Sequence, residues 1–177
     1  MSTVVVLVSL YGLGVVHSLI YQVFMRSHVS WRARPRYAIS RATRLFGLAL
    51  IPVYIAVLGD FPIAFYVFHQ PPPAPAVYAL AMALGVSSLV LLATSLRALG
   101  DNFSACTDGR LPLKIVDHGP YRFLSHPIYV SNVLLLVSCT VMLFSWVLVA
   151  ATLVTASFYL RSAMDEARAL RKLGPAS

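Results

Sequence analysis

Two groups of polar and ionisable residues flank a long apolar stretch in the second half of the chain. The first group occupies residues 117–132 and reads D-H-G-P-Y-R-F-L-S-H-P-I-Y-V-S-N, and the second contains Arg161, Asp165 and Glu166. Such side chains are costly beside hydrocarbon, so a dense set of them at a membrane face indicates a functional site. Two groups at the ends of one apolar stretch predict a single site built from both.

The first group combines a turn with the expected start of a helix. Gly119-Pro120 is a turn signal, which leaves unpaired backbone groups beside the membrane. After His126, Pro127 suits the first position of a helix. The N-terminus of a helix favours a carboxylate or another anion. This group is therefore suited to hold an anionic group, although His126-Pro127 alone would fit a simple helix start equally well.

The second group is expected to lie on one helix. Arg161, Asp165 and Glu166 stand at i, i+4 and i+5, so the first two share a face and Glu166 lies about 100° round from Asp165. Taken alone, Arg161 and Asp165 fit an ordinary ion pair at a membrane surface. If the apolar stretch folds back on itself, this group returns to the level of His126 and Tyr129. The occurrence of both groups in this order along the chain favours a functional site over a simple helix start and an ordinary ion pair.

The composition is that of a membrane protein. The chain has 177 residues, of which 59% are hydrophobic and 11% charged, and its mean hydropathy is +0.78. A soluble domain usually carries about 25% charged residues. We therefore expect an all-α polytopic membrane protein with one integral membrane domain, residues 1–177. No C-x-x-C motif and no Cys-His pair at ligand spacing occurs, so no metal site is predicted.

Four apolar stretches predict about five transmembrane helices. A spanning helix needs about 20 apolar residues, and residues 4–24, 45–67 and 77–96 have this length. Residues 128–160 carry no charge, and as one helix they would be roughly 50 Å long against a hydrocarbon core of about 30 Å. They are therefore predicted to form a helical hairpin that turns near Ser145-Trp146, with Trp146 at the interface.

Small and polar residues within these stretches point to helix contacts. Gly85 and the Ser87-Ser88 pair are expected to let another helix approach closely. His17 and Gln22 in the first stretch are expected to be polar groups whose hydrogen bonds are satisfied between helices.

The basic residues indicate the orientation in the membrane. All fourteen fall in three clusters, within residues 26–44, 97–122 and 161–172, which explains the net charge of +8 without invoking nucleic acid. Five helices with an outside N-terminus place every cluster on the cytoplasmic side, as the distribution of Lys and Arg requires. Residues 97–127 are then a cytoplasmic segment of the site, and residues 161–177 form a cytoplasmic helix that completes it.

The ordered motifs of the second half resemble a known family. H-G-P-Y-R, then S-H-P-I-Y, then an apolar hairpin ending in R-x-x-x-D-E-x-x-x-L-x-x-x-G is similar to the isoprenylcysteine carboxyl methyltransferase family, and L-G-D-N-F-S precedes them. The related membrane phospholipid methyltransferases share much of this pattern. The resemblance covers roughly residues 96–174. Ser125 stands where the family usually has Arg, and Ser131 stands where it has Gly, which is expected to narrow the approach to the cofactor.

The resemblance implies a site for S-adenosylmethionine. The positions that match the family's cofactor site are His118, Gly119, Pro120, Tyr121, His126, Pro127, Tyr129 and Glu166. Arg161 matches an Arg near the reacting centre, so Arg161 and Glu166 are the predicted catalytic residues. Methyl transfer from a sulfonium needs mainly positioning, desolvation and electrostatics.

The function expected from the resemblance is a membrane-embedded methyltransferase, dependent on S-adenosylmethionine, whose active site faces the cytoplasm. Its acceptor would be a lipophilic or prenylated molecule or a membrane lipid. The leading candidate is an isoprenylcysteine-type carboxylate, and the alternatives are a phospholipid amine and a small thiol. A carboxylate needs no general base, whereas an amine does, and His118, Asp165 and Glu166 are the candidates.

A non-catalytic module that binds haem or quinone is the alternative from another class. The five histidines suggest it, but His17 lies in the first span, His69 on the outer side, and His118 and His126 on the cytoplasmic side. No two face each other at a common depth, as bis-histidine ligation of haem requires.

Overall fold

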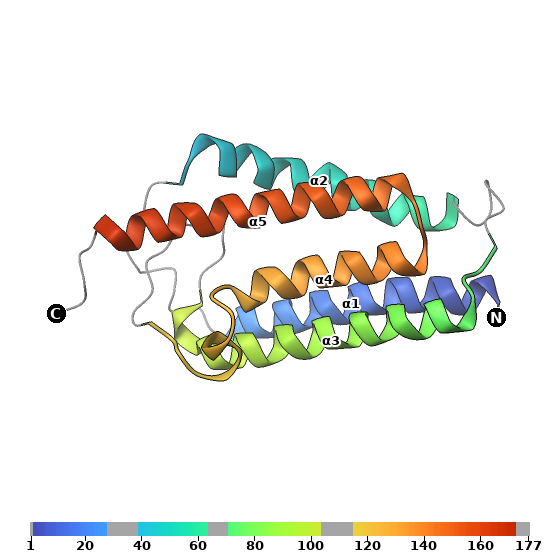
Figure 1. The fold of residues 1–177 in the computed structure, drawn as a ribbon, viewed down its shortest axis with the longest axis horizontal. Coiled ribbons are helices and arrows are strands. Elements are labelled where there is room, and N and C mark those ends of the chain that lie inside the picture. Colours follow the sequence, from blue (N-terminus) through green and yellow to red (C-terminus); the bar gives the residue numbers. More distant parts are fainter. Residues whose placement is uncertain (1, 28–38, 64–70, 104–114, 173–177) are drawn as a thin grey trace.

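The computed structural model describes residues 2–27, 39–63, 71–103 and 115–172, and these form helices and short connections (Figure 1). Within these ranges no strand occurs, so the prediction of an all-α protein is confirmed. Two short 3-10 helices, η3 (Gly100–Asn102) and η4 (Gly119–Arg122), follow the third long helix. The five long helices are α1 (Thr3–Ser27), α2 (Arg41–Pro62), α3 (Pro75–Leu99), α4 (Pro127–Met142) and α5 (Trp146–Lys172).

The long helices lie side by side along one axis (Figure 1). Helix α3 packs mainly on α4, α2 on α5, and α1 on α3. Helix α4 also packs on α5, so it links α1 and α3 to α2 and α5. The predicted first loop (residues 26–44), proline-rich turn, cytoplasmic segment (97–127) and C-terminal helix (161–177) lie partly outside the described residues.

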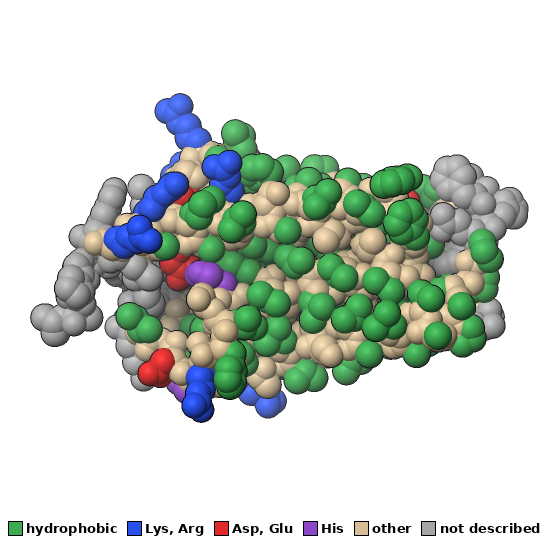
Figure 2. All heavy atoms as spheres, in the orientation of Figure 1, with side chains coloured by type: hydrophobic (Ala, Val, Ile, Leu, Met, Phe, Trp, Pro, Cys, Tyr) green, Lys and Arg blue, Asp and Glu red, His purple; other side chains and the backbone are tan. Residues whose placement is uncertain are grey.

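Four of the helices, α1, α2, α3 and α5, are long and apolar enough to cross a membrane. Helix α4 is apolar too, but its 16 residues extend only roughly 24 Å, less than a hydrocarbon core of about 30 Å. Together they make the expected polytopic membrane protein of about five helices. Apolar side chains cover the length of the bundle, as in Figure 2.

The hairpin of α4 and α5 turns where the sequence predicts. Helix α4 ends at Met142 and α5 begins at Trp146. Ser145 Oγ accepts a hydrogen bond from the backbone N–H of Val147 at 3.1 Å, and so starts α5 without the Gly or Pro that usually marks a turn. Phe144 and Trp146 are exposed and meet edge to face, which suits the membrane interface.

Small residues let α3 and α4 approach closely. The hydroxyl of Ser88 donates to the carbonyl of Ser131 at 2.8 Å, and the hydroxyl of Ser138 donates to the carbonyl of Ala81 at 2.7 Å. A Cβ at Gly85 would lie 2.6 Å from Leu13 Cδ1 of α1 and 2.9 Å from Ser138 Oγ of α4, so a larger residue there would have to displace these side chains. The contact expected of Gly85 and Ser88 is confirmed, and it fixes the position of α4.

Basic side chains gather at one end of the bundle (Figure 2). Arg26 ends α1, Arg41 begins α2, Arg97 lies in the last turn of α3, Arg122 lies in η4 and Arg168 near the end of α5. We call this the basic end. It is also where α4 begins, so both polar groups of the sequence lie there.

Labelling of single cysteines tests the predicted orientation of the basic end. In a chain with Cys106 replaced by Ser, Ala74→Cys at the opposite end is expected to react with an impermeant maleimide in intact cells. Arg171→Cys is expected to react only after the membrane is permeabilised, because Lys and Arg stay cytoplasmic. Reaction of Arg171→Cys in intact cells would show that the orientation is inverted.

Candidate functional site

The hairpin brings the start of α4 against the end of α5. His126 Nδ1 lies 3.7 Å from Glu166 Oε2, and each side chain is about one-third exposed, at 31% and 30%. Glu166 follows Trp146 by 20 residues, which is roughly 30 Å along a helix and equals the hydrocarbon thickness. With Trp146 at one interface, the pair of His126 and Glu166 therefore lies at the other edge of the apolar layer.

Stacked rings extend from this pair into the bundle. The rings of His126 and Tyr129 lie 4.9 Å apart at an angle of 5°, and those of Tyr129 and Tyr159 lie 4.7 Å apart at 22°. The side chains of Tyr129 and Glu166 are joined by a hydrogen bond. One helical turn further along α4, Asn132 Nδ2 donates to the hydroxyl of Tyr159. We call these five residues the aromatic ladder, which comprises His126, Tyr129 and Asn132 of α4 together with Tyr159 and Glu166 of α5.

The aromatic ladder has the chemistry of a cation site. His126, Tyr129 and Asn132 stand at i, i+3 and i+6, so α4 presents them along one face. The faces of stacked aromatic rings attract cationic groups, and the partly exposed Glu166 carboxylate beside them adds to the attraction. The N-terminus of α4 also favours an anion through the helix dipole, and His126 provides no side-chain cap there.

The predicted turn at Gly119-Pro120 is confirmed as η4, which packs against α3. Gly119 has φ of +60°, a conformation that residues with a side chain rarely adopt, and a Cβ there would lie 3.3 Å from Ala98. His118 is exposed with extended backbone, and Tyr121 is half-buried. The structure thus brings His126, Tyr129 and Glu166 together and places the other predicted cofactor residues of this segment against α3.

Arg161 lies on α5 five residues before Glu166 and is exposed. Five residues turn a helix by about 140° beyond one full turn, so the two side chains leave α5 in different directions. Its role at the reacting centre stays a prediction.

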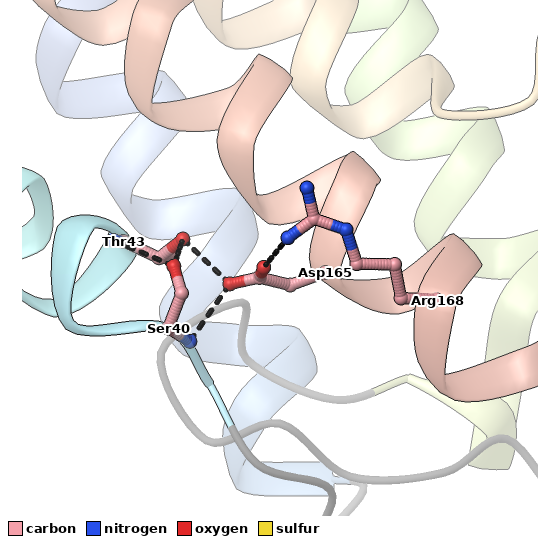
Figure 3. A network of polar contacts seen from close by, with 4 residues as sticks. All are labelled: Ser40, Thr43, Asp165 and Arg168. Carbon is pink, nitrogen blue, oxygen red and sulfur yellow. Dashed lines mark hydrogen bonds and ion pairs between the residues drawn. The ribbon is translucent and has the colours of Figure 1, made fainter. Parts of the chain in front are cut away.

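Asp165 joins α5 to the start of α2 (Figure 3). Its Oδ2 accepts hydrogen bonds from the backbone N–H of Ser40 at 2.9 Å and from the hydroxyl of Thr43 at 2.7 Å. Its Oδ1 lies 3.4 Å from Arg168, rather than forming the possible pair with Arg161. Asp165 is only 7% exposed, so its carboxylate stabilises the N-terminus of α2 and is poorly placed to act as a general base.

Replacing Asp165 by Ala is expected to lower the free energy of unfolding by about 2 kcal/mol, because two hydrogen bonds to a buried charge are lost. Thermal unfolding in detergent measures the change. Arg168→Ala is the control: Arg168 is 67% exposed, and an exposed ion pair contributes little. An equal loss in both variants would show that the ion pair, and not the cap of α2, is the stabilising contact.

A cavity of about 560 Å³ opens between α1, α2 and α4. Its lining is mainly apolar, but Asn132 of the aromatic ladder and His17 of α1 reach it. His17 on α1 lies beside the side chain of Asn132 on α4, and its Nε2 is buried. The expectation that His17 is satisfied between helices stays a prediction.

Residues 76–173, more than half of the chain, match the phospholipid methyltransferase family. The chain belongs to this family. The match includes η4, α4 and α5, and therefore the whole aromatic ladder. The family includes isoprenylcysteine carboxyl methyltransferases, so the resemblance is confirmed. No individual curated protein matches the chain significantly.

Membership of the phospholipid methyltransferase family makes this protein a membrane methyltransferase, and it favours the enzyme over a module that binds haem or quinone. Helix α1 and α2 lie outside the matched residues, so two walls of the cavity are not covered by the match.

The two residues at which this methyltransferase departs from the usual motif, Ser131 and Ser125, lie in different surroundings. Ser131 is fully buried, donates its hydroxyl to the carbonyl of Ile128 at 2.7 Å and meets α3 through its own carbonyl. This residue packs between α3 and α4, and the expectation that it narrows the approach to the cofactor stays a prediction. Ser125 is exposed before the start of α4.

Sequence reasoning missed Asn132, Tyr159 and Tyr21. Asn132 closes the first motif, but a single amide within an apolar stretch gives no signal of its own. Its bonds to Tyr159 and, at 3.3 Å, to Tyr21 join three helices that are far apart in the sequence.

Proposed function

We propose that this protein transfers the methyl group of S-adenosylmethionine to a lipophilic acceptor at the basic end of the bundle. The observation that carries the proposal is the pair of His126 and Glu166 beside the stacked rings of Tyr129 and Tyr159, within the residues that match the family. When bound, S-adenosylmethionine supplies an electrophilic methyl group on a sulfonium.

The residues present fit that molecule, which carries a carboxylate, an ammonium and a sulfonium. The Glu166 carboxylate, accessible but partly desolvated, would bind a cationic group, and the ring of Tyr129 would pack against one. The N-terminus of α4, which begins at Pro127, would attract the carboxylate through the helix dipole. His118, Gly119, Pro120 and Tyr121 would close the site from the side of α3.

The acceptor would enter from the bilayer. The cavity between α1, α2 and α4 is bordered by Val15, Leu19 and Leu58, which are exposed apolar residues on helices that span the membrane. An apolar tail would reach the site by this route while the polar donor arrives from the cytoplasm. The enzyme then acts by holding both groups in line and excluding water.

Two acceptor classes fit this route. The sequence motifs favour an isoprenylcysteine-type carboxylate, which Arg161 would attract, and which needs no base. The family match equally favours a phospholipid amine, for which Glu166 or His118 would have to accept a proton.

Calorimetric titration of the purified protein in detergent with S-adenosylhomocysteine tests the donor site. We expect saturable binding to one site per chain, and competition by S-adenosylmethionine. Absence of binding to protein that unfolds cooperatively would refute the proposed function.

A further inference from the structure

A hydrogen bond between α1 and α2 crosses the end of the cavity that lies away from the basic end, which we call the far end. The hydroxyl of Tyr11 donates to the carbonyl of Leu58 at 2.8 Å, and both residues line the cavity. In a regular helix this carbonyl accepts from the residue four positions later, which here is Pro62 and has no N–H. The Tyr11 hydroxyl therefore supplies the donor that α2 lacks, and it ties α1 to α2 at this point.

Buried apolar side chains close the rest of the far end. Leu10, Val57 and Cys139 line the cavity and are at most 5% exposed. They belong to one core cluster that continues with Met142 and Leu148. A chain that lies in the cavity thus meets either packed core or the bond between Tyr11 and Leu58.

The middle of the cavity contains a glycine that leaves space open. Gly14 is part of the lining, and a Cβ added there would meet no atom within 4 Å. A larger side chain at this position therefore has room to enter the cavity and to shorten it.

The cavity has a definite length from the donor site to the far end. Asn132 lines the cavity one helical turn after Tyr129. Cys139 follows Tyr129 by ten residues, which is roughly 15 Å along α4. Tyr21, which bonds to Asn132, follows Tyr11 by ten residues too, and this gives the same length along α1. An extended chain advances about 3.5 Å for every three backbone bonds, so roughly 15 Å holds about a dozen carbons.

We propose that this cavity measures the tail of the methyl acceptor and admits about a dozen of its carbons in extended form. Tyr11 is the residue that sets this specificity, because its bond to Leu58 closes the far end on the side of the lipid. The remaining carbons of a longer tail have to leave past Val15 and Leu19, which are exposed, and stay in the bilayer. The inference rests on the proposed function. Helices α1 and α2 lie outside the residues that match the family, so the limit comes from this chain's own residues.

Photolabelling in lipid nanodiscs tests the limit. The probes are S-octylcysteine, S-dodecylcysteine and S-hexadecylcysteine, each with a diazirine on the last carbon of its tail, so the labelled residue marks where the tail ends. Their head group carries a carboxylate and an amine and so represents both acceptor classes. Only label that excess S-dodecylcysteine displaces is counted, because this removes the unspecific labelling of lipid-facing surfaces, and it is mapped by mass spectrometry.

The dodecyl probe is expected to label the far end, around Tyr11 and Cys139, about tenfold more than the hexadecyl probe, since extra carbons do not fit a closed space. Equal labelling of the far end by both probes, or no displaceable label in the cavity from any probe, would overturn the proposal.

Gly14→Leu is expected to shorten the limit. It should reduce labelling of the far end by the dodecyl probe about tenfold and leave total labelling by the shorter octyl probe within about twofold of wild type. Gly12→Leu is the matched control, because a Cβ at Gly12 also meets no atom within 4 Å but Gly12 does not line the cavity. Equal losses in both variants, or undiminished labelling in Gly14→Leu, would overturn the proposal.

Tyr11→Ala is expected to lift the limit, so that the hexadecyl probe labels the far end about tenfold more than in wild type. Tyr78→Ala is the control, because Tyr78 shares a hydrogen bond of 2.8 Å with Ser9 of α1 but does not line the cavity. An unchanged pattern in Tyr11→Ala would remove Tyr11 as the limiting residue. S-adenosylhomocysteine binding on the same samples separates the two hypotheses: wild-type protein that binds it but shows no limit refutes only the tail limit, and protein that does not bind it refutes the proposed function.

Discussion

Replacing Glu166 by Gln is expected to weaken S-adenosylhomocysteine binding by on the order of 10-fold or more. Gln keeps the size of the side chain but removes its charge, and a hydrogen bond to a charged group is worth roughly 1.5–3 kcal/mol. His126→Ala is expected to have a similar effect, because it removes the ring that lies 3.7 Å from Glu166 and stacks on Tyr129. Calorimetric titration in detergent measures both affinities.

Arg168→Ala serves as the control for this prediction. Arg168 lies two residues after Glu166 on α5, is exposed and pairs with Asp165 rather than with the aromatic ladder. Its replacement is expected to leave the affinity within about twofold of wild type. Equal losses in all three variants would indicate damage to the end of α5, and unchanged binding in Glu166→Gln would remove Glu166 from the donor site.

The length of the acceptor's tail is expected to have the second large effect. Each methylene removed from water contributes about 0.8 kcal/mol, which corresponds to a factor of about four. We therefore expect kcat/KM, calculated with the total acceptor concentration, to rise by up to about fourfold for each methylene added to the tail. The apolar lining of the cavity and its exposed rim are the physical reason. The measurement compares acceptors with one head group and increasing tails, and farnesylcysteine with cysteine as the carboxylate pair.

Dilution of the acceptor with inert lipid is the control for lateral entry. If the acceptor enters from the bilayer, turnover follows its fraction in the lipid and falls as nanodisc lipid is added at a fixed total concentration. A short, soluble acceptor that is methylated as well as the long one would contradict lateral entry, and a small cytosolic thiol or amine would become the better substrate.

The order of helices could be predicted because it depends on length and charge. An uncharged stretch that would be roughly 50 Å long as one helix has to fold back in a hydrocarbon core of about 30 Å, and Trp146 suits the turn at an interface. The contact of His126 with Glu166 follows from the same hairpin, since antiparallel helices of known rise return to the same level. Gly85 and Ser88 could be assigned to a close contact from their size alone.

The directions of side chains at the site could not be predicted, because they depend on the rotation of each helix. Asp165 and Glu166 are neighbours in sequence, yet the 100° between them turns one to α2 and the other to α4. Ser131 matches a position of the cofactor motif but faces α3. The contact of His17 with Asn132 depends on how α1 and α4 are placed, and no local pattern encodes that.

Methyl transfer into membrane lipid tests the central claim most directly. Membranes containing the wild-type protein, incubated with S-adenosylmethionine labelled in its methyl group, are extracted with organic solvent, and the label in the extract is counted. We predict that the extract is labelled and that Glu166→Gln, expressed at the same level, reduces the label by about tenfold or more. An extract without label, or equal label from both proteins, would contradict the account.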